Sequence, residues 1–184
     1  AISAVLGKDK NLKQLVAQYP VIRSPGSWTL EETAIRAVVG QQISTKAARS
    51  VLARLARAAE VDGKTHGFPE PPALLRLEDA SYAMPGRRRE TLQALCRHCA
   101  SVEKGSNGQV DIEDLANIKG IGPWTTAMVA MRGAGDPDSW PPKDLGLVTA
   151  FEKLTANTDL ESLSRSWGPW RSYAANLLWR SLAT

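Results

Sequence analysis

The chain has 184 residues, of which 43% are hydrophobic and 23% are charged. This balance is typical of a globular protein that buries a core in one compact unit or two small lobes. No apolar run approaches the roughly 20 residues of a membrane-spanning helix, and the N-terminal residues lack a basic segment followed by an apolar one. We therefore expect an intracellular protein, cytoplasmic if bacterial, without a membrane partner. The net charge of +4 suits a polyanionic ligand without requiring one.

Apolar residues recur at helical spacing, and no period-two alternation is long enough for a sheet, which predicts an all-α fold. In the first half we expect helices over residues 29–39, 44–60, 74–77 and 87–102. Thr29 and Glu32 form a capping box, Ser44 is a second N-cap, and prolines at 69, 71, 72 and 85 break the chain before the later helices.

In the second half we expect helices over residues 111–118 and from 123 to near 133, and helices that begin at about 144, 158 and 169. Pro123 and Pro169 suit the first helical position, where a missing N–H costs nothing. Asp144 starts one helix, and Thr158 with Glu161 forms a capping box for the next.

The two cysteines, Cys96 and Cys99, have the spacing of half a metal site. A structural zinc site needs four ligands, and the only other histidine outside this segment, His66, lies in an unrelated loop. The i, i+3 spacing beside Leu92 and Leu95 instead predicts a buried helix face. We therefore expect no metal.

The segment Leu115-Ala-Asn-Ile-Lys-Gly-Ile-Gly-Pro-Trp-Thr-Thr-Ala resembles a helix-hairpin-helix motif, which we place at residues 111–133. Glycines allow a tight turn and close approach of a ligand. We expect the backbone at Gly120, Ile121, Gly122 and Thr125 to contact a DNA phosphate beside a helix N-terminus, which grips DNA without specifying sequence. A purely structural turn is the alternative.

Four elements occur in order: Ala37-Val-Val-Gly-Gln-Gln-Ile-Ser, Gly120-Ile-Gly-Pro-Trp-Thr, Arg132-Gly, and Asp138-Ser-Trp-Pro-Pro-Lys-Asp-Leu-Gly-Leu. Together they resemble the 3-methyladenine DNA glycosylase II family of the helix-hairpin-helix superfamily, from about Trp28 to Leu182. The resemblance implies two helical lobes around a base-binding cleft, with residues 1–184 as one catalytic region. Family members often have an additional N-terminal domain, which leaves open that the chain is a fragment.

The resemblance implies a monofunctional DNA glycosylase that flips alkylated bases of the 3-methyladenine type out of duplex DNA and hydrolyses their glycosidic bond, initiating base excision repair. It implies no cofactor and a monomer. The family's catalytic aspartate corresponds to Asp144, whose anion can stabilise positive charge on the sugar or activate water. An ordinary N-cap is the alternative, and both roles are compatible.

The resemblance also assigns the base pocket to Trp124, Met128 and Trp179, with Trp179 as the platform for a cationic purine. Relatives can carry an aromatic residue where Met128 stands, and the tryptophans can instead be core residues. Gln41 and Gln42 are candidates to fill the gap left by a flipped base, with Gln42 the closer match and loop contacts as the alternative.

Bifunctional relatives attack the sugar with a lysine at the position of Trp124, so we expect no lyase activity. The alternatives are a non-catalytic helix-hairpin-helix module, a catalytically lapsed domain, and a glycosylase for oxidised bases, although that lysine and a four-cysteine cluster are missing. The basic residues Lys46, Arg49 and Arg87 to Arg89 either meet phosphates or are solvated.

Overall fold

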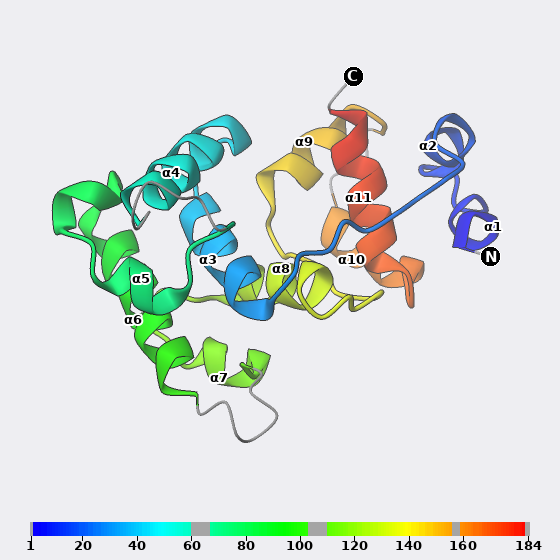
Figure 1. Cartoon of the computed structure of the whole chain (residues 1–184). Coiled ribbons are helices and arrows are strands. Elements are labelled where there is room, and N and C mark those ends of the chain that lie inside the picture. Colours follow the sequence, from blue (N-terminus) through cyan, green and yellow to red (C-terminus); the bar gives the residue numbers. More distant parts are fainter. Residues whose placement is uncertain (1, 60–66, 103–109, 156–158, 183–184) are drawn as a thin grey trace. The chain divides into compact units, whose positions relative to one another are not determined.

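The computed structural model describes residues 2–59, 67–102, 110–155 and 159–182, and all regular structure in this part is helical (Figure 1), which confirms the all-α prediction. The α-helices are α1 (Ile2–Leu6), α2 (Lys13–Gln18), α3 (Leu30–Gly40), α4 (Thr45–Ala58), α5 (Pro71–Leu75), α6 (Gly86–Ser101), α7 (Ile112–Ala116), α8 (Pro123–Arg132), α9 (Leu145–Glu152), α10 (Leu160–Ser164) and α11 (Arg171–Ser181), and the 3₁₀ helices are η1 (Asp79–Tyr82) and η2 (Arg165–Trp167). Within the described residues, no helix has the length and apolar character needed to traverse a bilayer.

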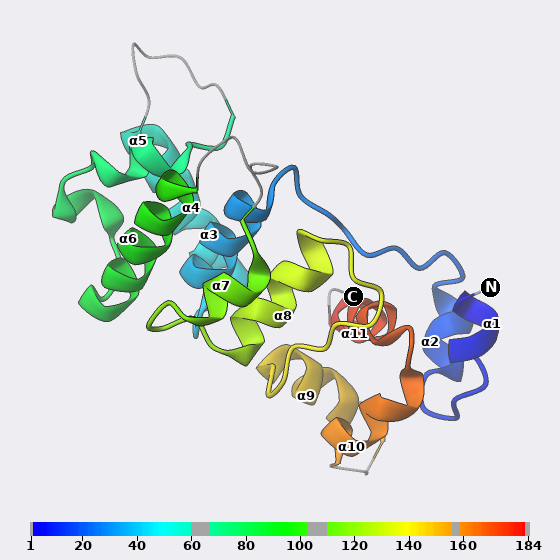
Figure 2. The ribbon, with the colours of Figure 1, turned by 90° about the horizontal axis from the view of Figure 1, so that it is seen from below.

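The chain divides into two compact units, in agreement with the two expected lobes. We call Ser27–Val129 the central unit, and Ala1–Gly26 with Ala130–Thr184 the terminal unit. In the central unit α3 and α5 both pack on α6, and α5 lies beside α6 in both views (Figures 1 and 2). Fully buried side chains such as Ile35, Leu55 and Leu92 form its core.

The core of the terminal unit is built around Trp167, which is 2% exposed. Its ring makes edge-on contacts with Trp140 and Phe151, and the ring centres are 5.7 Å and 6.3 Å away, respectively. Its Nε1 donates to the Asp9 carboxylate at 3.0 Å, which satisfies the polar atom of an otherwise apolar ring. Around this cluster α11 packs against α9 and α2.

The predicted helix starts at three positions are confirmed by side-chain caps. The Thr29 hydroxyl accepts from the Glu32 N–H and the Ser44 hydroxyl accepts from the Ala47 N–H. Asp144 caps α9 in the same way. The helix that follows Ser44 is described as far as Ala58, and its predicted end at Glu60 lies outside the described residues.

Three other predicted boundaries are wrong. Helix α5 begins at Pro71 rather than Leu74, because prolines in the first turn need no N–H partner. The cap of α10 is Asp159, which accepts from the Ser162 N–H, whereas the predicted cap Thr158 lies outside the described residues. Helix α11 begins at Arg171 rather than Pro169. Helices α1 and α2 were not predicted.

The cap of α4 permits a matched test of helix stability. Replacing Ser44 with alanine removes the acceptor for the Ala47 N–H and is expected to lower the free energy of unfolding by about 1 kcal/mol. The control is Ser50→Ala in the same helix, where the hydroxyl only donates back to the Lys46 carbonyl, so the change is neutral or slightly stabilising. Urea unfolding measures both, and equal losses contradict the capping role.

Candidate active site

Asp144 is fixed by two hydrogen bonds to one oxygen. Its half-buried side chain lies at the N-cap of α9. Oδ1 accepts from the Leu147 N–H at 2.9 Å and from the Trp179 indole Nε1 at 2.9 Å. The N-cap interpretation is therefore confirmed, and the carboxylate additionally holds an aromatic ring. A negative side chain at a helix N-terminus is also stabilised by the helix dipole.

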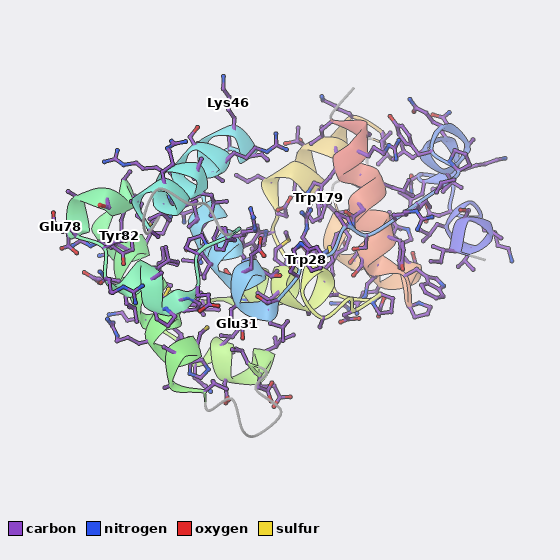
Figure 3. All side chains as sticks on the ribbon, in the orientation of Figure 1. Trp28, Glu31, Lys46, Glu78, Tyr82 and Trp179 are labelled. Carbon is purple, nitrogen blue, oxygen red and sulfur yellow. The ribbon has the colours of Figure 1, made fainter. Side chains whose placement is uncertain are left out.

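The second feature of this site is a cation on the tryptophan. Trp179 lies near the end of α11 (Figure 3). The Arg132 guanidinium carbon is 5.3 Å from the centre of the Trp179 ring, within the range of a cation–π contact. Burial lowers the pKa of Arg132, and the negative charge of Asp144 opposes that shift. Arg132 therefore belongs to the site, a role that sequence analysis missed although the Arg132-Gly element was noticed.

Gly146 leaves the space that brings Asp144 and Trp179 together. A Cβ atom at this position would lie 3.1 Å from the Asp144 Oδ1 and 3.1 Å from the Trp179 Cδ1. Both distances are tighter than ordinary van der Waals contacts. A side chain here would push the ring away from the carboxylate. The glycine directly after Asp144-Leu145 was the sequence signal for this requirement, and it was not used.

The hairpin belongs to the central unit and needs glycine at one of its two positions. Gly120 has φ +95°, and an added Cβ would lie 3.1 Å from the Thr91 Cβ. The Thr91 hydroxyl donates to the Lys119 carbonyl at 3.2 Å, which fastens the turn to α6. At Gly122 an added Cβ would meet no atom within 4 Å. The missing side chain therefore leaves that backbone open to close approach.

Two of the hairpin residues predicted to contact DNA form hydrogen bonds within the protein. The Ile121 N–H donates to the Ile118 carbonyl at 2.9 Å, and the Ile121 side chain is buried. Thr125 is 2% exposed, and its hydroxyl is hydrogen-bonded to the Gln41 amide at 3.0 Å. The Ile121 N–H and the Thr125 hydroxyl therefore have partners inside the protein, and contacts of this hairpin with DNA stay a prediction.

The two glutamines differ in their surroundings. The Gln41 Nε2 donates to the Gly120 carbonyl at 2.9 Å as well as to Thr125, so this side chain links the end of α3 to the hairpin. This is the loop contact that was the alternative to intercalation. Gln42 is exposed, with φ +56°. Of the two candidates, Gln42 is therefore the one whose side chain is exposed to solvent at this turn.

The remaining two pocket residues lie in the central unit. Trp124 and Met128 are half-buried on α8 and pack against the core of that unit. For Trp124, this packing agrees with the core role that was the alternative to a pocket role. The structure thus brings Asp144 and Trp179 together within the terminal unit, while a common pocket with Trp124 and Met128 stays a prediction.

The cysteines form part of the core of the central unit, which confirms the predicted buried face. Cys96 is buried and Cys99 is half-buried, and both thiols are free. Burial raises the pKa of each thiol to about 12, so both are protonated at neutral pH. Within the described ranges, no three histidine, cysteine or acidic side chains form a group able to hold a metal.

The predicted basic residues are not equivalent. Arg89 pairs with Asp79 at 3.1 Å, so its charge is partly used within the protein. Lys46 and Arg49 are exposed on α4, and Lys46 extends from that helix in Figure 3. Arg87 is also exposed. Contacts from these residues to phosphates stay a prediction.

Known proteins resemble the chain over almost its whole length, although no family model matches it. A Mycobacterium tuberculosis protein named a probable bifunctional transcriptional activator/DNA repair enzyme is 37% identical over 195 residues, covering 99% of this chain and 39% of that protein. A DNA-3-methyladenine glycosylase of Bacillus subtilis is 29% identical, covering 95% of this chain and 64% of that protein. The chain thus spans less than two thirds of either relative.

Among solved structures, the 3-methyladenine DNA glycosylase of Schizosaccharomyces pombe in complex with abasic DNA matches with a TM-score of 0.79 at 26% identity, over 100% of this chain and 97% of that one. The whole-chain match in fold and the sequence relatives agree with the four sequence elements. The chain belongs to the 3-methyladenine DNA glycosylase family of the helix-hairpin-helix glycosylase superfamily.

Proposed function

We propose that residues 1–184 form the catalytic region of a monofunctional DNA glycosylase that hydrolyses the glycosidic bond of alkylated bases of the 3-methyladenine type in duplex DNA. The observation that carries this proposal is a carboxylate, Asp144, fixed by the Leu147 N–H and by the indole of Trp179. The names of the relatives support the substrate class. The enzyme acts inside the cell as a monomer without a cofactor.

The chemistry needs an anion more than an acid. When an alkylated purine carries positive charge, it leaves the sugar as a neutral base and takes the electron pair of the glycosidic bond with it. Positive charge then develops on the sugar, where the fixed carboxylate of Asp144 stabilises it. Water forms the new bond to the sugar carbon, and Asp144 accepts its proton.

Trp179 supplies an aromatic surface next to that carboxylate. A cation over a desolvated indole gains up to about 2 kcal/mol. The Arg132 guanidinium already lies over this ring at 5.3 Å. A cationic base stacks on the face of Trp179 that Arg132 leaves uncovered. The family resemblance assigns Trp124 and Met128 to base binding as well.

The central unit supplies the DNA grip. At Gly122 no atom lies within 4 Å of where a Cβ would be, so a ligand can approach the backbone closely. This backbone binds a phosphate at the start of α8. Gln42, exposed at its turn, fills the space of the flipped nucleotide. Gln41 holds the turn against the hairpin and does not enter DNA.

The charge of Asp144 is separable from its hydrogen bonds. In Asp144→Asn the remaining oxygen still accepts from Leu147 and Trp179, because both donors meet Oδ1, and asparagine caps helices as well as aspartate does. We expect the release of methylated purines from methylated duplex DNA to fall by about 100-fold or more, with binding to abasic-site DNA retained.

The matched control is Asp159→Asn, which changes another N-cap in the same unit. Its rate of base release, followed by chromatography of the free bases, should equal that of the unaltered protein. Equal rates in Asp144→Asn and the unaltered protein would remove Asp144 from the mechanism.

The indole of Trp179 provides both an aromatic face and an N–H donor, and a phenylalanine variant separates these two roles. Trp179→Phe keeps an aromatic face but loses the Nε1 that donates to Asp144. Because a hydrogen bond to a charged group contributes about 1.5–3 kcal/mol, we expect the single-turnover rate of base release to fall roughly tenfold. Trp28→Phe, at a residue that is 95% exposed, is the control and should leave the rate unchanged. An unaltered rate in Trp179→Phe would show that the bond does not assist catalysis.

Trp124 stands where bifunctional relatives carry an amine, so the enzyme cannot form a Schiff base there. We expect no covalent adduct when the protein, labelled methylated duplex DNA and borohydride are incubated together and separated on a denaturing gel. The product DNA should also stay intact until alkali is added. A borohydride-dependent adduct would overturn the assignment as a monofunctional glycosylase.

A further inference from the structure

The residue before Asp144 has an unusual backbone conformation. Lys143 has φ +56°, in the left-handed region that side chains other than glycine and asparagine rarely adopt. For an ordinary L-residue this conformation is strained, because its Cβ lies too close to the following carbonyl oxygen. The direction in which the chain enters Asp144 depends on this angle, so contacts that hold Lys143 also influence the carboxylate.

One side chain holds this segment from outside it. The Glu161 Oε1 accepts from the Lys143 N–H at 2.8 Å, and the Glu161 Oε2 accepts from the Trp140 Nε1 at 3.2 Å. Pro141 and Pro142 have no N–H, so Lys143 has the first backbone donor after Trp140. The carboxylate therefore binds the donors available at both ends of this four-residue turn.

Glu161 lies on a helix that is attached to the core of the terminal unit. Its helix α10 is followed directly by η2, which carries the buried Trp167, and the Trp140 ring packs on the edge of that same residue at 5.7 Å. The tether thus connects Lys143 to the core of the terminal unit rather than to another loop.

We propose that Glu161 is a positioning residue, which keeps Lys143 in the left-handed conformation so that the Asp144 carboxylate stays on the Leu147 N–H and the Trp179 indole. This inference rests on the proposed catalytic role of Asp144. Glu161 does not touch the substrate. It acts through the backbone of Lys143.

The first test replaces Glu161 with alanine and measures single-turnover base release and binding to abasic-site duplex DNA. We expect the rate to fall about tenfold while the affinity changes less than twofold. Glu152→Gln, at an exposed position on α9, is the control and should change neither. A rate in Glu161→Ala equal to that of the unaltered protein overturns the proposal.

The second test removes the backbone strain at residue 143 instead of the tether. Glycine adopts positive φ freely, so Lys143→Gly removes the need for the tether. In that background Glu161→Ala should lower the rate less than twofold. A loss as large as in the lysine background would mean that Glu161 acts in some other way, and would overturn the proposal.

A third readout does not depend on activity. The Leu147 N–H donates to the Asp144 carboxylate, so its hydrogen exchange, followed by NMR, reports whether that carboxylate stays in place. We expect faster Leu147 exchange in Glu161→Ala and unchanged exchange in Glu152→Gln. If the unaltered protein releases no methylated base, the proposed function fails, and this measurement alone decides the positioning role: unchanged exchange refutes it.

Discussion

The candidate site depends on one shared acceptor, the Oδ1 of Asp144. It receives a backbone N–H from α9 and an indole N–H from α11, so a local helix cap and a tertiary contact meet at a single atom. Their meeting requires the close packing of these two helices and the absence of a side chain at Gly146. The buried Trp167 cluster beneath them supports this packing.

Sharing that oxygen couples stability and chemistry. A carboxylate that caps a helix does not need to reorganise when charge develops on a sugar, which is the condition for electrostatic catalysis. The same arrangement places the positive charge of Arg132 on the neighbouring ring, where it interacts with Asp144. The guanidinium thereby offsets part of the cost of holding an anion in a half-buried position, and it occupies one face of the Trp179 ring.

The sequence predicted features whose partners are near in the chain. Thr29, Ser44 and Asp144 were recognised as caps because each accepts an N–H three residues later. Glu161 was predicted as a capping partner, but its carboxylate binds Lys143, 18 residues away, a distance that no local pattern encodes.

Longer-range features required other information. The hydrogen bond between Asp144 and Trp179 spans 35 residues. The family resemblance assigned both residues to the active site, but it did not predict this bond. Helices α1 and α2 are too short to be stable alone and are held by buried side chains such as Leu6 and Leu15, so their pattern was weak. The sequence did not predict the contacts that hold the loop leading to Asp144. Three side chains of the C-terminal 24 residues bind successive points of the segment 138–144. Arg171 pairs with Asp138, Glu161 accepts from the Lys143 N–H, and the Trp179 indole donates to Asp144. A loop tied in this way differs from an ordinary surface connection, because moving any one of these points strains the other two. The carboxylate at its end is therefore held both by the cap of α9 and by the loop that leads to it.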